Sequence, residues 1–514
     1  MLLRVKEEAR RYVSLDSMPV RMLASEDPER FLQRYAPQLL PAIKLRCDAK
    51  PFLPSEGPQP NAGLGTELYY GSYAQPYLER DIDPDGQAVD IAAPSSRPGA
   101  SARSTFYSIT TMHLYQSIDC FATQTYTYPM IPRKLEEHIR ASARYYPVVT
   151  VTGPRQSGKT TLLRSMWPDK AYASLENPDT LVFASSDPRG FLRQGDKGGL
   201  IIDEAQRHPA LFNYLQGYAD ESGPGRYILS GSNNFLLMER ITQSLAGRTA
   251  ITTLLPLAAA ELPPDAIGDS WEAMAWTGFF PRVRTTELPA DQFSRDYLAT
   301  YIERDVRLVK NIGDLSAFRR FVKLCAGRAG QLLNMNGLAS DAGISVNTAK
   351  SWLGLLEAAW LVVILPPWHE NYNKRVIKSP KLYWVDTGLL CHALDIASAS
   401  DLAYHPYRGA IFENLIVAER YKAAANQGKS PELYFWRDST GREVDIVDNS
   451  SGVPALWECK SGMTIGSDYF KQLDYIGDLM RVPTERRLLA YGGSEDQTRS
   501  AATVLAWRTA LLRP

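Results

Sequence analysis

Cysteine, histidine and long apolar runs are all scarce in this sequence of 514 residues. The 5 cysteines form no CxxC pair and the 6 histidines form no HxxxH pair, which argues against a disulfide framework and a structural zinc site. The longest apolar run, from Ala358 to Leu365, is less than half of what a bilayer requires. Charge begins at Arg4 without a signal-peptide core, so the sequence predicts a cytoplasmic protein with no membrane partner.

An excess of either charge is also lacking, because 57 Lys and Arg residues balance 57 Asp and Glu residues. A chain without net charge is not a general polycation, so any contact with nucleic acid must come from a local basic patch. A hydrophobic share of 44% and a charged share of 22% are typical of globular proteins. At roughly 150 residues per domain, the length allows two to four domains.

Two segments without apolar periodicity, residues 53–65 and 92–104, are rich in Pro, Gly, Ser and Ala and are predicted to be linkers. Between and after them, up to about Pro129, no element is predicted. A second feature of this part is repetition. Residues 12–34 align without gaps to residues 172–194 with 9 identities in 23 positions, where chance gives about one or two.

A second repeated block follows in the same order, because Tyr73–Ile82 (YAQPYLERDI) matches Tyr297–Val306 (YLATYIERDV). Two matches in one order indicate a shared origin. Residues 1–129 are therefore predicted to be a partial, degenerate and poorly ordered copy of the module that follows.

From Met130 the pattern becomes regular. A helix is predicted after Pro132, and the β-branched run Val148–Thr152 is followed by a glycine-rich turn and another helical segment. Strand-like runs recur at Gly199–Ile202 and Tyr227–Ser230, with helical stretches between them. This alternation predicts a parallel α/β sheet.

The strongest motif is GPRQSGKT, a full GxxxxGK[ST] between an apolar strand and a helix. Its glycines let backbone N–H groups converge on phosphate oxygens, and the helix N-terminus adds a favourable dipole. Lys159 would reach the β and γ phosphates, while the Thr160 hydroxyl would ligate Mg²⁺. The predicted ATP-binding residues are Gly153, Pro154, Arg155, Gln156, Ser157, Gly158, Lys159, Thr160 and Thr161.

A second motif, GLIIDE, is an apolar strand that ends in two carboxylates. Asp203 is predicted to complete the ATP site by holding Mg²⁺ through water, and Glu204 to polarise the attacking water as general base. The order of the two motifs, a P-loop and then this Walker B strand, predicts ATP as substrate and Mg²⁺ as cofactor.

Polar residues after the third strand supply further candidates. Ser230 and Asn233 could each orient the attacking water, and spacing does not choose between them; an ordinary polar loop is the alternative. Arg248, after Gly247, could supply positive charge to the γ-phosphate, either in cis or in a neighbouring subunit of a homo-oligomer. The alternative for Arg248 is a surface salt bridge.

Seven segments within residues 130–480 together resemble a widespread bacterial and archaeal family of AAA-type ATPases with a C-terminal domain of unknown function. They are GPRQSGKTTL, LIIDEAQ, YILSGS, SLAGR, YIERDV, LLNMNGLASDAGIS and SPKLYWVDTGL. The resemblance covers about two-thirds of the chain. It implies an AAA-like P-loop core, then a winged-helix segment, then a domain similar to PD-(D/E)XK nucleases.

The segment after the predicted core has helix-turn-helix spacing, with helices at Asn336–Ala342 and Val346–Leu356 and Ser345 as candidate N-cap. From Thr300 to Lys381 there are 12 Lys and Arg against 6 Asp and Glu, which favours a nucleic-acid surface. The second helix carries only Lys350, so a packing lid on the ATPase core is the stronger alternative. The better phosphate-contact candidates are Lys374, Arg375, Lys378 and Lys381.

Near the C-terminus, two alternating segments flank the turn DNSSG. A hairpin centred between Ser451 and Gly452 would place Asp445 opposite Glu458 and Glu443 opposite Lys460 on one face. Opposed carboxylates repel unless they bind a cation, so Asp445 and Glu458 are predicted to hold Mg²⁺ with Lys460 beside them. The resemblance implies Glu413 as a further acid of that site. The alternative is a decayed fold that is kept for binding.

The predicted fold class is therefore α/β, with an AAA-like P-loop NTPase core, a winged-helix segment and a restriction-endonuclease-like α/β domain. The predicted boundaries are 1–129 for the degenerate copy, 130–293 for the ATPase core, 294–380 for the helical segment and 381–514 for the nuclease-like domain. The predicted function is a Mg²⁺-dependent ATPase coupled to a nuclease-like domain with DNA or RNA as partner. The alternative is a nucleotide-gated protein-binding scaffold or signalling switch without nuclease activity.

Overall fold

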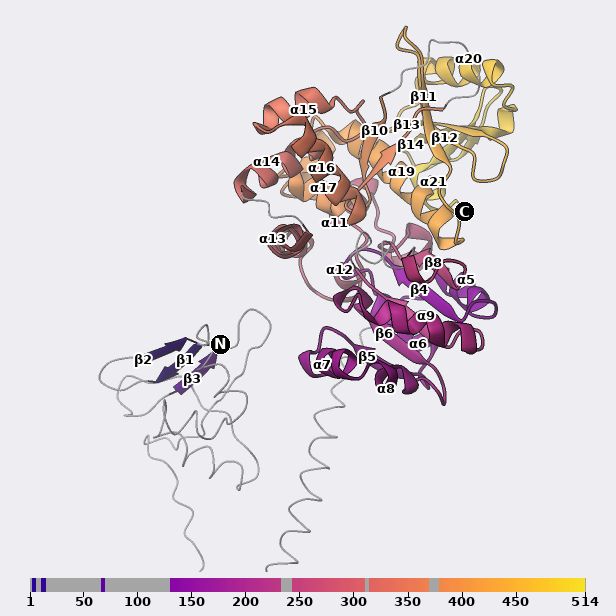
Figure 1. Ribbon diagram of the computed structural model, residues 1–514. Helices are drawn as coiled ribbons and strands as arrows, with labels where there is room; N and C mark the ends of the chain where they lie inside the picture. The colour runs from indigo at the N-terminus through magenta and orange to yellow at the C-terminus, as the bar shows by residue number, and fades with distance from the viewer. Residues whose placement is uncertain are drawn as a thin grey trace, which may run out of the picture. The chain divides into compact units, whose positions relative to one another are not determined.

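The computed structural model describes residues 2–5, 11–14, 66–69, 130–232, 243–309, 314–368 and 379–513 (Figure 1). They belong to two compact units, Met1–Thr125 and Tyr126–Pro514. Within these described ranges no helix is both long enough and apolar enough to cross a bilayer.

The N-terminal unit contains a small antiparallel sheet with the strand order β2-β1-β3. Its strands are β1 (Leu2–Val5), β2 (Arg11–Ser14) and β3 (Thr66–Tyr69). Strand β3 lies where no element was predicted, because the four residues TELY show no alternation of polar and apolar side chains. Strand β2 coincides with the start of the repeated block, at the position that corresponds to strand β5 of the second unit.

The second unit begins with a five-stranded, fully parallel sheet in the order β5-β6-β7-β4-β8. Its strands are β4 (Val148–Thr152), β5 (Ala171–Ser174), β6 (Leu200–Asp203), β7 (Tyr227–Ser230) and β8 (Thr249–Thr253). The predicted strands β4 and β7 are confirmed to the residue, and β6 is shifted by one. Because β4 lies between β7 and β8, its carboxyl end is a topological switch point, where ligands bind in open α/β sheets.

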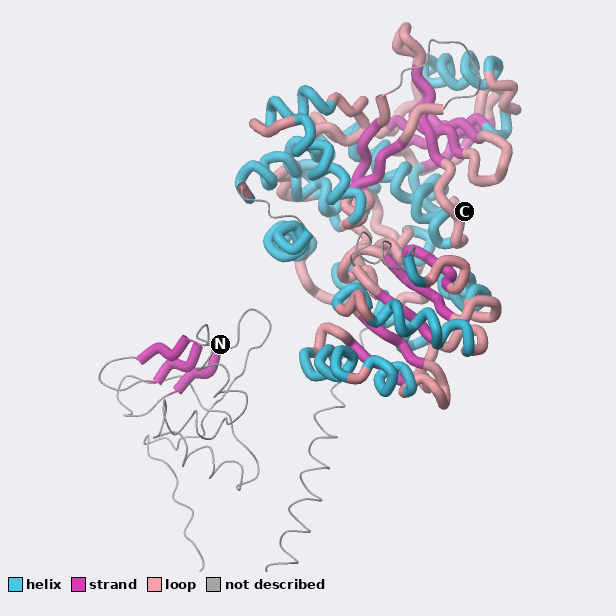
Figure 2. The backbone as a smooth tube through the Cα atoms, in the orientation of Figure 1, coloured by secondary structure: helices cyan, strands magenta, loops and turns pink. Residues whose placement is uncertain are grey.

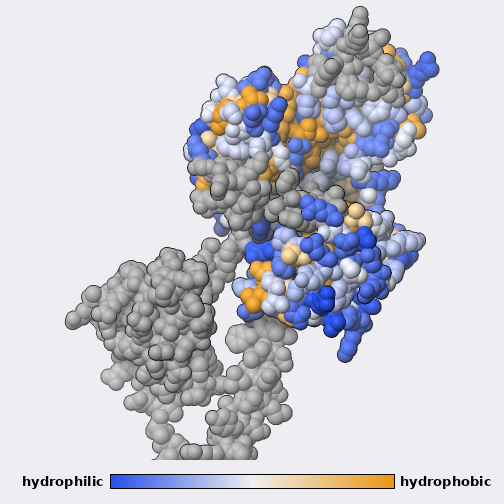
Figure 3. Space-filling model, in the orientation of Figure 1, coloured by the Kyte–Doolittle hydropathy of each residue, from blue (hydrophilic) through white to orange (hydrophobic). Residues whose placement is uncertain are grey.

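Helices cover both faces of this sheet (Figure 1). Alternate residues of the buried strands point to opposite faces, so Ile201 joins one apolar cluster while Leu200 and Ile202 join the other. One face is covered by α5 (Leu135–Ser142) and α6 (Lys159–Met166), and the other by α7 (Pro178–Ser186), α8 (Pro188–Arg193) and α9 (Leu211–Glu221). The outer surface is mostly hydrophilic, with an orange patch over α7 where Val182 and Phe183 are exposed (Figure 3).

A mainly helical segment follows, as expected from Ser294 to Leu365 (Figure 2). Its elements are α11 (Trp271–Thr277), α12 (Pro281–Thr285), α13 (Ala290–Val309), α14 (Leu315–Ala326), α15 (Met335–Ala342), α16 (Val346–Ala358) and the antiparallel strands β9 (Val362–Leu365) and β10 (Lys381–Trp384). The predicted helix-turn-helix spacing is confirmed. Gly343 ends α15 with φ +70°, and the Ser345 hydroxyl caps α16 by accepting from Thr348 N at 3.1 Å.

The last part is a six-stranded mixed sheet in the order β11-β12-β13-β14-β16-β15. Its elements are α17 (Thr387–Ala393), α18 (Ala399–Tyr404), α19 (Arg408–Asn426), β11 (Leu433–Arg437), β12 (Glu443–Asp448), β13 (Ala455–Lys460), α20 (Lys471–Leu479), β14 (Arg487–Tyr491), β15 (Gln497–Thr498), β16 (Thr503–Ala506) and α21 (Trp507–Leu512). The predicted hairpin register is confirmed, because Ile446 pairs with Trp457 and Asp448 with Ala455. Gly452 turns the hairpin with φ +75°.

Helix α19 joins the helical segment to this last sheet. Its buried Asn414 accepts from Trp384 N at 2.7 Å and donates to Trp384 O at 2.8 Å, so the side-chain amide satisfies a strand peptide of β10. One apolar cluster runs through the helical segment and the last sheet, from Leu255 to Leu511. The two parts are therefore packed on a single core.

Candidate functional site

The P-loop connects the carboxyl end of β4 to the first turn of α6. Gly153 has φ +140°, and a Cβ there would lie 2.1 Å from Leu254 O, so a larger residue has no room. Gly158 has φ +93° and caps α6 in a left-handed conformation. Both glycines of the motif are thus required by the backbone, and the loop lies at the switch point of the sheet.

Lys159 is held inside this loop. Its Nζ donates to Gly153 O at 3.0 Å and to Pro154 O at 2.7 Å, and the residue is 6% exposed. Burial lowers the pKa of Lys159 to about 8, although the carboxylates of Glu204 and Asp203 act in the opposite direction. A poorly solvated ammonium group at a helix N-terminus is well prepared to bind an anion.

Asp203 is the point where three hydroxyl groups meet. Thr160 Oγ1 donates to Asp203 Oδ2 at 2.6 Å, Tyr172 Oη donates to the same oxygen at 2.9 Å, and Ser230 Oγ donates to Oδ1. Burial and the neighbouring Asp203 raise the pKa of Tyr172 above its usual range, so its hydroxyl remains a donor. The structure therefore brings together the predicted residues Thr160, Asp203 and Ser230. Tyr172 was not predicted, because nothing in a single Tyr on a short strand marks it.

Glu204 follows Asp203 in a left-handed conformation, with φ +53°. For a non-glycine residue this conformation costs of order 1–3 kcal/mol and is typical of functional sites. Gln206 Nε2 donates to Glu204 Oε2 at 2.6 Å, and Ser232 Oγ donates to the same oxygen at 3.2 Å. Both contacts were missed from the sequence. Asn233, the other candidate of the third strand, lies outside the described residues.

Arg248 lies at the end of β8 opposite to the P-loop of its own chain, which favours a role in trans over a role in cis. It precedes β8, and Thr249 pairs with Val148, the first residue of β4. The P-loop begins after the last residue of β4, roughly 13 Å further along the strand. At its own end of the sheet, Arg248 makes a bidentate ion pair with Asp220, with Nε–Oδ1 2.6 Å and Nη2–Oδ2 2.9 Å. The predicted alternative, a surface salt bridge, describes this contact.

A buried ion pair supports the loop from below, and sequence reasoning missed it. Arg133 donates to Ser157 O at 2.8 Å, to Leu255 O at 2.7 Å and to Glu261 Oε1 at 3.1 Å. The side chains of Arg133 and Glu261 are 6% and 0% exposed. Their separation along the chain leaves no local pattern from which the pair could be found.

The loop residues fit a magnesium–nucleotide complex. The Thr160 hydroxyl and the Asp203 carboxylate are hard oxygen donors, which Mg²⁺ prefers. Ser157 Oγ is buried within the loop and has no hydrogen-bond partner among the described residues. A buried polar atom without a partner is costly, so the loop has unused capacity for a polar ligand.

The C-terminal carboxylates also lie together, as the confirmed hairpin register requires, but a lysine lies among them. Lys381 Nζ is 2.9 Å from Glu413 Oε1 and 4.0 Å from Asp445 Oδ1, and it also pairs with Glu443. Lys460 pairs with Glu458 at 2.6 Å. Over the described residues, no group of three or more Asp, Glu, His or Cys is arranged to hold a metal ion. The Mg²⁺ site predicted at Asp445 and Glu458 stays a prediction, and the structure adds the ammonium group of Lys381 beside Glu413, Glu443 and Asp445.

Burial dominates the electrostatics of this cluster. It raises the pKa of Glu458 to about 8 and that of Glu413 to about 7, with Asp445 adding to both shifts. The pKa of Asp445 is raised by burial as well, while Lys381 and Lys460 act against that shift. Of the basic cluster predicted to contact phosphate, Lys381 is thus buried in this site, and Lys374, Arg375 and Lys378 lie outside the described residues.

Three family models match successive parts of the chain. Residues 145–262 match the AAA domain family, residues 268–400 match a domain of unknown function (DUF8612), and residues 408–510 match another (DUF4143). The chain is 33% identical over 338 residues to the uncharacterized proteins Rv2008c of Mycobacterium tuberculosis and Mb2031c of Mycobacterium bovis, which covers 65% of this chain and 74% of each relative. The chain belongs to the family of these two proteins.

Within this family arrangement, the AAA domain contains the P-loop, and the chain has an AAA-type P-loop ATPase domain that binds ATP. Lys381 belongs to the middle domain, whereas Glu413, Asp445 and Glu458 belong to the last one.

Solved structures are also similar, at a low level. The Walker-type ATPase PABY2304 of Pyrococcus abyssi has 16% identity and a TM-score of 0.34, covering 51% of this chain and 96% of that one. RuvB of Thermotoga maritima has 17% identity and a TM-score of 0.25, covering 45% and 88%. Similarity at this level supports no conclusion about the chain.

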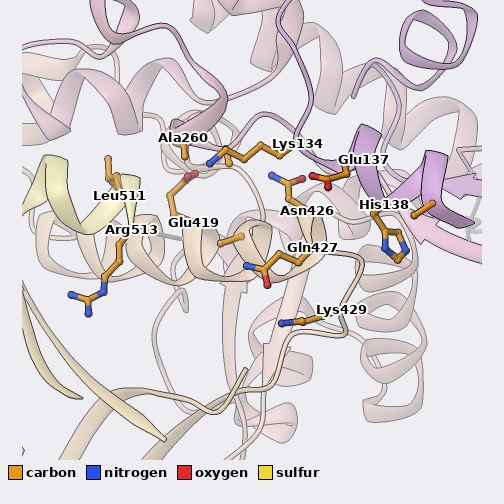
Figure 4. A pocket seen from close by; sticks show the side chains of 13 residues that line it. Lys134, Glu137, His138, Ala260, Glu419, Asn426, Gln427, Lys429, Leu511 and Arg513 are labelled. Atoms are coloured by element: carbon orange, nitrogen blue, oxygen red, sulfur yellow. The ribbon is translucent and has the colours of Figure 1, made fainter. Parts of the chain in front are cut away.

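A pocket of about 630 Å³ lies apart from both sites, between α5 and the end of α19 (Figure 4). Lys134, His138, Asn426, Lys429 and Arg513 are among its lining residues. None of the site residues predicted from the sequence lines it, so the pocket does not belong to the nucleotide site.

Proposed function

We propose that this protein is a Mg²⁺-dependent ATPase whose hydrolysis cycle controls its C-terminal part. The observation that carries this proposal is the convergence on Asp203 of hydroxyl groups from Thr160, Ser230 and Tyr172, where Thr160 directly follows the P-loop lysine. Such a preorganised carboxylate beside a phosphate-binding loop has one evident use, the handling of a metal–nucleotide complex.

Lys159 and the loop amides would bind the phosphates. On binding, the Lys159 ammonium would exchange the carbonyls of Gly153 and Pro154 for phosphate oxygens. Thr160 and Asp203 would hold Mg²⁺, which neutralises charge on the phosphates when bound. Ser230 acts on Asp203 rather than on the substrate, and so is a positioning residue.

Glu204 would take the proton of the attacking water. Its Oε2 accepts from Gln206 and Ser232, so two donors orient the carboxylate. Oε1 would then face the attacking water, and the rate of hydrolysis would depend on both donors.

For the C-terminal part we propose a winged-helix segment and a restriction-endonuclease-like domain that bind nucleic acid. The succession α14-α15-α16 with the hairpin β9–β10 supports the former, and α19-β11-β12-β13-α20-β14 supports the latter. No cleavage step is proposed, because Lys381 lies where the metal would act. The competing proposal is a protein-binding scaffold, which the poorly basic helix α16 favours, since Lys350 is its single Lys or Arg.

The test is ATP turnover of the full chain with and without single-stranded DNA, duplex DNA and RNA. We expect Mg²⁺-dependent hydrolysis, and stimulation by at least one nucleic acid that falls as salt is raised. Hydrolysis that no nucleic acid changes would favour the scaffold, and no hydrolysis at all would contradict the central proposal.

Arg248 is proposed to act only in trans, on the site of a neighbouring subunit. Loss of an arginine finger reduces turnover by roughly 10³–10⁵. Mixing an Arg248→Ala chain with a Lys159→Ala chain would then restore activity. A monomeric wild type by light scattering, with no rescue on mixing, would leave Arg248 as the partner of Asp220 alone.

A further inference from the structure

The carboxylate cluster of the last domain receives one of its cations, Lys381, from another domain. Lys381 is the first residue of β10, which pairs with β9 in the helical segment. Glu413 projects from α19, and Glu443 and Asp445 project from β12. A single lysine therefore connects three carboxylates of the last domain, one on α19 and two on β12, to the antiparallel pair β9–β10.

The lysine is deeply buried in this position. The Lys381 side chain is 3% exposed, and its Nζ also lies 5.5 Å from the ring centroid of Phe435. Tyr383, two residues further along β10, donates its hydroxyl to Glu413 as well. Two side chains of β10 thus bind the same carboxylate, which indicates a specific contact between β10 and α19.

Three cations of the cluster offset most of the negative charge of its four acids without a metal. The acids are Glu413, Glu443, Asp445 and Glu458, and their basic partners are Lys381, Arg437 and Lys460. Since burial favours the neutral form of a carboxyl, one protonated acid leaves a cluster of zero net charge. A divalent ion would have to displace a cation that is already hydrogen-bonded, and buried charge without a partner is costly.

Most carboxylate oxygens are also engaged. Asp445 Oδ2 accepts from Cys459 N at 2.8 Å, and Glu458 Oε1 accepts from Lys460 at 2.6 Å. Glu458 Oε2 is buried without a hydrogen-bond partner among the described residues. The cluster is not arranged as a group of three or more metal ligands within the part of the chain that the structure describes.

Strand β10 is fixed too firmly to act as a removable plug. Its neighbour Pro380 accepts from Leu333 N at 2.7 Å, and Leu382 O accepts from Gly330 N at 2.8 Å. Leu382, Tyr383 and Trp384 are all fully buried. Withdrawing Lys381 would mean unpacking the core that the helical segment shares with the last sheet.

We propose that Lys381 is the permanent counter-ion of this cluster, and that the cluster is a joint between the helical segment and the last domain rather than a metal centre. The proposal does not depend on ATP, and its test needs no nucleotide. It predicts that the nuclease-like domain of this chain binds no catalytic metal at Asp445, and that removal of one lysine creates a metal site.

The experiment compares thermal unfolding of the full chain with EDTA and with millimolar Mn²⁺ for the wild type, Lys381→Met and Lys422→Met. Lys381→Met keeps the approximate length of the side chain and leaves Glu413 without its ion-pair partner. We expect it to melt lower in EDTA and to recover by roughly 5 °C in Mn²⁺, because an ion that binds only the folded state stabilises it.

Lys422→Met is the matched control. Lys422 is equally buried and forms an ion pair with Glu419. Because this ion pair supplies only one carboxylate, Mn²⁺ should not bind tightly in place of the lysine. Lys422→Met should melt lower and gain no more from Mn²⁺ than the wild type does. Equal Mn²⁺ gains in both variants would overturn the proposal.

If Lys381→Met fails to fold, the proposal is tested by counting the Mn²⁺ ions that the wild type and Asp445→Asn bind, with electron paramagnetic resonance. The proposal requires that Asp445→Asn leaves the number of bound ions unchanged. Loss of one bound ion in Asp445→Asn would overturn it, because the metal would then belong to the wild-type site.

Discussion

The P-loop site and the C-terminal cluster contain similar groups and use them in opposite ways. Each has a buried lysine next to buried carboxylates. Lys159 donates to backbone carbonyls, and Asp203 accepts from neutral hydroxyl groups, so neither charge is neutralised by a direct ion pair with the other. Lys381 forms ion pairs directly with Glu413 and Glu443, so its charge is already used within the cluster.

What separates the two sites is the direction from which the lysine comes. Lys159 is on the loop that it serves, where carbonyl oxygens are exchanged for phosphate at little cost in structure. Lys381 comes from another domain, and the pair it forms holds two domains together. We infer that a group of acids with a lysine is prepared for a ligand when the lysine is bonded to neutral groups, such as backbone carbonyls, that a ligand can replace.

The largest expected effect is on the first of these lysines. Lys159→Ala should lower ATP hydrolysis by at least about 10²–10³-fold and weaken ATP binding, since the phosphates lose the loop's cation. Turnover and nucleotide affinity measure this. The matched control is Lys170→Ala, whose Nζ also donates to carbonyls, of Gly198 and Gly225, but ahead of β5 at the other edge of the sheet. Equal losses in both variants would contradict the role of Lys159.

Glu204→Gln should reduce turnover by roughly 10²–10⁴-fold and leave ATP binding intact, because the shape is kept and the base is lost. Single-turnover kinetics and nucleotide binding separate the two effects. Glu176→Gln is the control, because Glu176 follows β5 but pairs with Arg207 at 3.2 Å. If Glu204→Gln hydrolyses ATP like the wild type, another group must be the base.

The nucleotide site was largely predictable, and the C-terminal site was not. Gly153, Lys159, Thr160 and Asp203 follow from a contiguous motif, because a P-loop needs neighbouring backbone groups. The register of Asp445 and Glu458 also followed from alternation around one turn. Lys381 did not, since its role depends on how β10 packs against α19, and local sequence carries no signal for that.

The loop's support is expected to matter for stability. Arg133→Met should lower the free energy of unfolding by about 3–5 kcal/mol, because it leaves Glu261 buried without its cation. Urea unfolding measures this. Arg140→Met is the control, because Arg140 pairs with Glu136 on an exposed helix face, where such pairs contribute about 0.3–0.5 kcal/mol. If Arg133→Met lowers the free energy of unfolding no more than Arg140→Met does, the Arg133–Glu261 pair does not stabilise the loop.

Proton uptake on ATP binding sharpens the contrast further. In the free protein the pKa of Lys159 is about 8, lowered by burial, so the amine is about half protonated at pH 8. Phosphate charge raises that pKa in the complex, so ATP binding should take up roughly half a proton at pH 8, and affinity should fall as pH rises through 8. Calorimetry in buffers of different ionisation enthalpy measures the uptake. Lys159→Arg, which stays charged, should show less.

The smallest effect is expected from the N-terminal unit. Strand β2 and strand β5 begin the two copies of one repeated block, but the residue of the first copy that corresponds to Asp203 is Ile43. The first copy therefore lacks the metal carboxylate around which the second is organised. A chain that begins at Met130 should keep the ATP turnover and nearly the melting temperature of the full chain.

A chain that begins at Leu135 tests whether this result is specific. It removes only five further residues, among them Arg133 and Lys134. The Arg133 side chain and the Lys134 backbone N–H both donate to Glu261. This shorter chain should melt lower and bind ATP more weakly. If the chain from Met130 already shows these losses, the N-terminal unit stabilises the ATPase domain, and its description as a degenerate copy without function must be abandoned.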